Sequence, residues 1–191
     1  METLLLTESD IRQRIWMELQ RATHDRHHEW RAPVLATVDA NGMPQARTVV
    51  LRQASAALGT LQIYTDRRSP KVAELAATPE VALAFWSKRL GWQLRVQAIA
   101  SVQHTGPEVD AVWSRLSQSP AASDYLSACA PGDVWHNTHT SGDSDKAPGH
   151  PGPHQLAIIT AQVQCVDWLE LARSGHRRAL FTAQRWERRV P

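Results

Sequence analysis

The sequence predicts a mainly β (α+β) fold, in which antiparallel strands form a closed or partly open barrel with peripheral helices. Two observations predict it. Seven segments contain β-branched or alternating apolar residues bounded by turn signals, namely residues 33–39, 45–52, 60–65, 80–86, 92–104, 155–170 and 177–183. Most connections between these segments are too short for a helical crossover, so we expect neighbouring strands to pair antiparallel. Closing such a sheet into a barrel would remove its exposed edges.

A helix is predicted before the first strand. Thr7 and Asp10 have the spacing of a capping box, in which each side chain satisfies a backbone N–H group of the other residue. Ile11, Ile15 and Leu19 follow at helical spacing. We therefore expect this helix to pack an apolar stripe onto the body of the fold.

Turn signals predict where the chain reverses. Asn41–Gly42 separates the first two predicted strands and is a strong short-range signal for a β-hairpin. Gly91 and Gly175 mark two further predicted hairpins. The connections at residues 66–79 and 105–130 are long enough to hold helices.

The start of the helix predicted in the first of these connections has the features of an anion site. Ser69 is a good N-cap residue, and Pro70 suits the first helical position. Helix N-termini present unpaired N–H groups and a partial positive charge, so anions bind there. Lys71 adds a full charge, and Arg47 and Arg52 would add two more if their strand is adjacent. The sequence therefore predicts a phosphate site at the edge of a sheet.

Length and composition are those of a globular protein, and we expect one domain over residues 1–191. A net charge of +2, with scattered basic residues, gives no case for a nucleic-acid partner. No segment reads as a signal peptide or a membrane span, so no membrane partner is expected. Cys129 and Cys165 are too far apart for a zinc or redox motif and fit the reduced thiols of a cytoplasmic protein.

Two histidine-containing regions are candidates for a metal site. His24, His27 and His28 follow the first helix without a carboxylate or cysteine framework, so an exposed polar linker is the favoured interpretation. Residues 131–153 are rich in Pro, Gly, Ser, Asp and His and lack periodicity, which predicts a mobile surface insertion or a lid. No metal site is predicted.

The predicted strands also carry a series of motifs. Their order is Asn41-Gly-x-Pro44, Arg47-Thr-Val-Val-Leu-Arg52, Tyr64-Thr-Asp-x-x-Ser-x-Lys71, Thr78-Pro79, Phe85-Trp86, Gln93-Leu-Arg-Val96, and finally Trp168, Arg177-Arg178, Trp186 and Pro191. In this order and spacing they resemble pyridoxamine 5'-phosphate oxidase and its FMN-binding relatives, over roughly residues 30–104 and 155–191. The resemblance implies a six-stranded antiparallel FMN-binding split β-barrel (Greek key) with peripheral helices. It also implies a homodimer with FMN at the interface.

The resemblance assigns roles to individual residues. The implied FMN contacts are Arg47, Thr48, Val49, Val50, Leu51, Arg52, Tyr64, Thr65, Ser69, Lys71, Gln93, Trp168 and Arg178. Arg47 and Lys71 would hold the phosphate, and some of the other contacts would come from the second subunit. His176 and Arg52 are the implied catalytic residues, in contact with the small-molecule substrate. Taken singly, each of these residues also fits an ordinary role as a surface arginine, a packing aromatic or a helix cap.

The resemblance is incomplete where the substrate would bind. The oxidases carry Arg-x-His after the C-terminal tryptophan, whereas this chain has Ser174-Gly-His176. Their Arg-Pro-x-x-Ser-Gln motif is matched only by the shorter Arg115-Leu-Ser117-Gln118. These departures argue against pyridoxamine 5'-phosphate as an efficient substrate and leave FMN binding intact.

The expected function is that of an FMN-dependent oxidoreductase, which transfers hydride from a small substrate to FMN and is reoxidised by dioxygen. The sequence names neither the substrate nor the electron acceptor. Two alternatives stay open. One is a non-catalytic flavin-binding module, and the other is a reductase of the same fold that uses another flavin-like or haem ligand.

Overall fold

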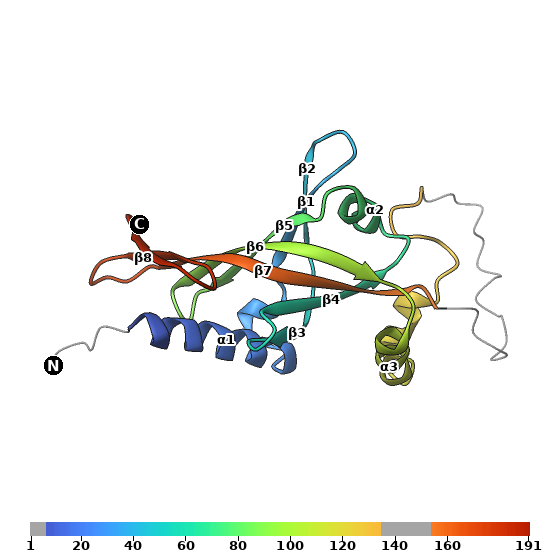
Figure 1. Cartoon of the computed structure of the whole chain (residues 1–191). Helices are drawn as coiled ribbons and strands as arrows, with labels where there is room; N and C mark the ends of the chain where they lie inside the picture. Colours follow the sequence, from blue (N-terminus) through green and yellow to red (C-terminus); the bar gives the residue numbers. More distant parts are fainter. Residues whose placement is uncertain (1–6, 135–153) are drawn as a thin grey trace.

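The structure is a computed structural model that describes residues 7–134 and 154–191. In this part of the chain, nine strands form one sheet with helices packed around it (Figure 1). The strands are β1 Val34–Val38, β2 Pro44–Thr48, β3 Leu51–Ser55, β4 Thr60–Asp66, β5 Glu80–Ser87, β6 Trp92–Gln103, β7 Leu156–Glu170, β8 Arg177–Phe181 and β9 Trp186–Arg189. The α-helices are α1 Glu8–His24, α2 Pro70–Ala77 and α3 Pro107–Leu116, and two short 3-10 helices are η1 Glu29–Arg31 and η2 Pro120–Tyr125.

The strand order is β2-β1-β5-β6-β7-β4-β3, and β8 and β9 extend the sheet from one end of β7. Every pair is antiparallel. The predicted mainly β class and the predicted antiparallel pairing are therefore confirmed. Within the described residues the sheet is open, because β2 and β3 end the path without pairing to each other. The strand count is nine instead of the expected six.

The largest departure from the predicted strands is the segment 45–52. It was expected to form one strand, but it is interrupted at Val49 and Val50, so that β2 pairs with β1 and β3 pairs with β4. At the interruption the Val49 N–H group donates to the Pro33 carbonyl at 2.9 Å. β2 lies at one end of the strand order and β3 at the other, so the chain must break between them. The break depends on the positions of distant partner strands, and the segment 45–52 therefore contains no local signal for it. β9 was also not predicted.

Helix α1 begins as predicted. The Thr7 hydroxyl accepts from the Asp10 N–H group at 3.2 Å, and the Asp10 carboxylate accepts from the Thr7 N–H group at 2.9 Å, which completes the capping box. The stripe that contains Ile11, Ile15 and Leu19 is buried, and the helix packs against β3. Hydrophobic burial along this stripe fixes α1 on one face of the sheet.

The prediction of an exposed linker after α1 is wrong for His28. This side chain is buried, and its Nε2 lies 2.7 Å from the Glu18 carboxylate, while its Nδ1 accepts from the Trp30 N–H group at 3.1 Å. Arg89 reaches the same carboxylate at 2.6 Å. His28 therefore ties α1 to η1, and Arg89 ties the same carboxylate of α1 to the turn between β5 and β6.

The predicted hairpin at Gly91 shows why glycine stands there. Gly91 has a φ of 66°, and a Cβ atom on it would lie 2.7 Å from the Leu171 carbonyl oxygen. Its own carbonyl accepts from the Leu171 N–H group at 2.7 Å. A larger residue would therefore be strained and would clash with the neighbouring connection.

The core lies on one face of the sheet. Strand β5 alternates strictly, with Val81, Leu83 and Phe85 buried and with Ala82 and Trp86 exposed on the opposite face. A second, smaller apolar cluster lies between α3, η2 and the start of β7. Among the described residues, the outer face of β1, β5 and β6 has exposed apolar side chains, including Val34, Trp86 and Ile99.

The predicted insertion at residues 131–153 falls mostly outside the described residues, of which only 131–134 belong to it. No helix within residues 7–134 or 154–191 is both long enough and apolar enough to cross a membrane.

Candidate functional site

Four predicted site residues meet where β4 turns into α2. We call Arg47, Thr65, Ser69 and Lys71 the anion corner. The Lys71 ammonium group donates to the Thr65 hydroxyl at 3.1 Å and to the Ser69 hydroxyl at 2.5 Å. Ser69 occupies the N-cap position as predicted, but its hydroxyl makes no capping hydrogen bond to the described backbone and accepts from Lys71 instead.

The two cations of the anion corner lie close enough to repel each other. Burial lowers the pKa of Lys71, and the Arg47 guanidinium lowers it further. A lowered pKa means that the ammonium form of Lys71 is disfavoured in the free protein. An anion bound between the two side chains would reduce the repulsion between their charges. The pair of cations therefore favours anion binding.

The turn that carries the corner is held by Asp66. Its carboxylate accepts from the Arg68 N–H group at 2.7 Å and from the Arg68 guanidinium at 2.6 Å. Burial alone would raise the pKa of Asp66, but the hydrogen bonds from Arg68 outweigh that effect and lower it. Arg68 also donates to the Ser127 carbonyl at 2.9 Å, which joins this turn to the segment after η2.

Arg47 has two further partners that the sequence analysis missed. Its guanidinium donates to the Glu74 carboxylate at 2.8 Å and to the Thr37 hydroxyl, and that hydroxyl donates to Glu74 at 2.5 Å. Glu74 lies on α2 and Thr37 on β1. The available sequence signal was the spacing of Glu74, which stands three residues after Lys71 and therefore lies on the same side of the helix.

The segment after Arg47 is only partly accessible. Thr48 is exposed and Val50 is half-buried, whereas Val49 and Leu51 are buried. The Val49 N–H group is already bonded to Pro33, and Leu51 pairs with Ile63 of β4 in the core. Their expected contacts with a flavin ring stay predictions.

Arg52 and Tyr64 lie away from the anion corner. The register of β3 against β4 shifts between Leu51 and Gln53, so Arg52 stands at an irregularity of the ladder. Its guanidinium lies 5.8 Å from the centre of the Tyr64 ring. Together with Arg115 of α3, both line a cavity of about 730 Å³, which we call the second cavity; the first lies beside the start of α1. Burial raises the pKa of Tyr64, and the charges of Arg115 and Arg52 partly oppose this shift.

Gln93 and Arg178 share the outer face of the sheet. Gln93 of β6 and Arg178 of β8 both pair with Leu169 of β7, so their side chains point to the same side. The Arg178 guanidinium donates to Asp167 at 2.8 Å and 3.0 Å, and Arg95 donates to the same carboxylate. These bonds, led by the one from Arg178, lower the pKa of Asp167 against the effect of burial.

Trp168 lies on the other face. It is 2% exposed and packs edge-on against Trp92, with ring centres 5.2 Å apart. Its cross-strand partners are Leu94 and Ala179, both buried. The side chain of Trp168 therefore points away from those of Gln93 and Arg178, and its packing accounts for a tryptophan at this position.

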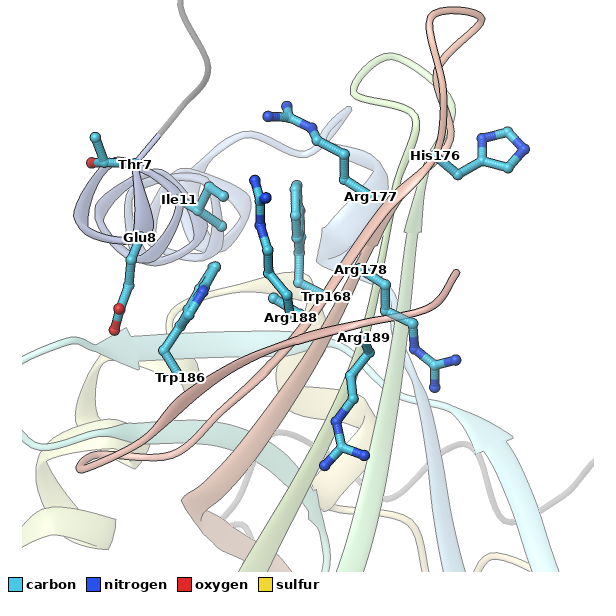
Figure 2. Close-up of a pocket in the computed structure, with 11 residues that line it drawn as sticks. Thr7, Glu8, Ile11, Trp168, His176, Arg177, Arg178, Trp186, Arg188 and Arg189 are labelled. Carbon is cyan, nitrogen blue, oxygen red and sulfur yellow. The ribbon is translucent and has the colours of Figure 1, made fainter.

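A cavity of about 500 Å³ lies where β8 and β9 approach the start of α1 (Figure 2). Arg177 and Arg188 point toward α1, whereas Arg178 and Arg189 point to the opposite side of the hairpin. His176 is exposed at the rim, and its Nδ1 accepts from the Ala172 N–H group at 3.3 Å. Figure 2 shows its imidazole directed away from α1.

The predicted site is thus divided within one chain. The anion corner lies beside α2, whereas the β8 end of the sheet, with Arg178 and His176, lies beside the start of α1 (Figure 1). His176 and Arg52 line different cavities. Among the side chains of residues 7–134 and 154–191, no group of three or more His, Cys, Asp or Glu is placed to hold a metal ion.

Comparison with known proteins gives a consistent sequence match. Residues 13–104 match the family described as "Pyridoxamine 5'-phosphate oxidase, FMN-binding domain". A pyridoxine/pyridoxamine 5'-phosphate oxidase from Granulibacter bethesdensis is 35% identical over 114 residues, which are 53% of this chain and 53% of that protein. The chain therefore matches about half the length of such curated relatives.

Solved structures show the same fold. A pyridoxamine 5'-phosphate oxidase-related, FMN-binding protein from Nostoc punctiforme has a TM-score of 0.72 and 20% identity, covering 98% of this chain and 100% of that chain. PhzG from Burkholderia lata, solved with tetrahydrophenazine-1-carboxylic acid, has a TM-score of 0.71 and 17% identity, covering 98% and 96%. The sequence matches confirm the resemblance to the pyridoxamine 5'-phosphate oxidase family that the motifs predicted, and the two solved structures show the fold expected from it, the FMN-binding split barrel.

Proposed function

We propose that the protein binds FMN, with the phosphate in the anion corner. The observation that carries this proposal is the position of Arg47 of β2 beside Lys71 of α2. Arg47 donates to Glu74, one helical turn after Lys71, at 2.8 Å, and its charge lowers the pKa of Lys71. The donor set fits a phosphate, because within residues 7–134 and 154–191 the partners Thr37 and Glu74 use two of the N–H groups of Arg47. In the same part of the chain, Lys71 keeps one N–H group beyond the two bonded to Thr65 and Ser69. The first turn of α2 adds its partial positive charge.

A second copy of the chain completes the site in this proposal. The outer face of β1, β5 and β6 carries exposed apolar side chains, among them Val34, Ile99 and Trp86, which is 47% exposed. A groove of about 520 Å³ crosses the same face. Pairing of two such faces about a two-fold axis would cover them and bring Gln93 and Arg178 of one copy toward the anion corner of the other. Trp86 is the cross-strand neighbour of Gln93 and lies in this interface.

The proposed activity is that of an oxidoreductase. Bound FMN would supply a two-electron acceptor for hydride, with dioxygen as the final oxidant. The residues of the chain orient the substrate. Arg52 and Arg115 give the second cavity two cations beside the Tyr64 ring, which suits a planar substrate that carries an anionic group. In the proposed dimer, His176 of the second copy would approach the substrate from the side opposite Arg52.

The purified protein tests this proposal through its absorption spectrum and its anaerobic reduction. We expect flavin bands that bleach when a suitable amine or dihydro-aromatic acid is added without oxygen, and that return with air. An Arg52→Met variant should retain FMN and lose reduction rate. Flavin that no candidate substrate bleaches would favour a non-catalytic flavin-binding module. A haem spectrum with no affinity for FMN would contradict the proposal and favour the haem alternative.

A further inference from the structure

We propose that Glu74, together with Thr37, is a positioning residue that holds Arg47 beside Lys71 and so sets the preference for a phosphorylated flavin. This inference rests on the proposed FMN site and adds two residues to it. Neither residue would touch the flavin. They would act through the guanidinium of Arg47.

The three side chains form a closed network. The Thr37 hydroxyl donates to the Glu74 carboxylate at 2.5 Å and accepts from Arg47, while a second nitrogen of Arg47 donates to the same carboxylate at 2.8 Å. One hydroxyl and one carboxylate thus hold the guanidinium at two nitrogens. That arrangement fixes the plane of the guanidinium, which a single contact would leave free to rotate.

The burial of these side chains indicates whether Glu74 holds Arg47 in place or competes with a bound phosphate for it. Glu74 is 9% exposed and Thr37 is 3% exposed, whereas about a quarter of the Arg47 side chain is exposed. If Arg47 swung away toward a ligand, the buried carboxylate would lose its hydrogen bond from a cation and, among the described residues, keep one hydrogen-bond donor, the hydroxyl of Thr37. Leaving a buried charge poorly paired is costly. The network is therefore expected to persist when phosphate binds.

A fixed guanidinium matters because Lys71 is close by. Without a partner, Arg47 would move away from the Lys71 ammonium and into solvent, since like charges repel. Glu74 offsets that repulsion, so both cations already occupy the corner before the phosphate arrives. Preorganisation of this kind raises affinity by reducing the ordering cost of binding.

The experiment compares FMN and riboflavin titrations, followed by flavin fluorescence, on the full chain and on Glu74→Gln. Glu8→Gln is the matched control, because it removes an exposed ion pair of similar length, 2.9 Å, to Arg12. We expect Glu74→Gln to raise the Kd for FMN about tenfold, equivalent to about 1.4 kcal/mol, and to leave the Kd for riboflavin unchanged. Glu8→Gln should change neither. In an Arg47→Met background, Glu74→Gln should have no further effect on FMN, because the two residues act as one unit.

Other results would overturn the inference. Tighter FMN binding by Glu74→Gln would mean that Glu74 competes with phosphate for Arg47. An equal loss for FMN and riboflavin would assign Glu74 to general packing. If Glu74→Gln does not fold, Thr37→Val compared with Thr37→Ser gives the same reading, with the loss of FMN preference confined to Val. If the unchanged protein itself bound riboflavin as tightly as FMN, the proposed phosphate site would fail first, and the inference with it.

Discussion

Replacing Lys71 with methionine separates two effects of this lysine, one on the stability of the FMN-free protein and the other on FMN binding. In the free protein the ammonium group is half-buried and faces Arg47, and both features lower its pKa. A lowered pKa in a base means that the fold disfavours the charge. Removing the charge should therefore leave the melting temperature of the FMN-free protein unchanged or slightly higher. The same change removes one charge-assisted contact from the proposed phosphate site.

The size of the effect on binding follows from that contact. A hydrogen bond to a charged group contributes about 1.5–3 kcal/mol, so a loss of about 2 kcal/mol would weaken FMN binding about 30-fold. At an FMN concentration about 100 times the Kd, the unchanged protein gains about 2.7 kcal/mol, or about 5–11 °C in Tm for a chain of this size. At the same concentration the variant would gain about 0.9 kcal/mol, or about 2–4 °C.

Thermal unfolding with and without FMN measures both quantities. Lys88→Met is the matched control, because Lys88 is exposed at the β5–β6 turn, and it should behave as the unchanged protein does. A Lys71→Met variant that FMN stabilises as strongly as the unchanged protein would refute the role of Lys71. A large loss of stability without FMN would instead show that Lys71 is needed for the fold.

Three further predictions concern the interface, the Asp167 cluster and the substrate. Ala82→Glu, which puts a charge on the exposed outer face of β5, should produce monomers in sedimentation velocity and abolish tight FMN binding; a dimer with normal affinity would contradict the proposed interface. The pKa of Asp167 is lowered in the fold, so its contribution to stability is present above its ordinary value of 3.8 and is lost as pH falls below it. Asp167→Asn should therefore lower the Tm at neutral pH and have little effect well below pH 3.8, whereas an equal loss at both pH values would show that charge is not involved. Pyridoxamine 5'-phosphate should be a poor substrate, with kcat/KM below about 10⁴ M⁻¹ s⁻¹ in a coupled peroxide assay, and a higher value would make the protein an efficient oxidase of that compound.

Local signals accounted for much of the fold. The capping box at Thr7 and the hairpins at Gly42, Gly91 and Gly175 depend on residues within a few positions of one another, and the structure confirms them. Features that depend on distant partners were missed. The break at Val49 has its cause in the positions of β1 and β4 at different places in the sheet. The segment Trp186–Arg189 was not predicted as a strand, yet Trp186 stacks on Phe181 and the segment forms β9.

The candidate site shows the same division. Arg47, Ser69 and Lys71 were predicted to converge, and they do, because the helix start after β4 is encoded locally by Ser69 and Pro70. Arg52 was expected to join them, but a shift in strand register puts it in another cavity. A register shift is set by the partner strand, so the alternation of residues along β3 did not indicate it. Glu74 of α2 was missed because its partners, Thr37 and Arg47, lie on β1 and β2, far from it in the sequence.

The proposed FMN site requires that the anion corner hold a phosphate group. Parallel calorimetric titrations of the full chain with FMN and with riboflavin, which differ only by that phosphate, test it most directly. Contacts from both Arg47 and Lys71, each contributing about 1.5–3 kcal/mol, predict that FMN binds at least about 100-fold more tightly than riboflavin. Equal affinity for the two flavins would contradict the claim, whatever the absolute affinity.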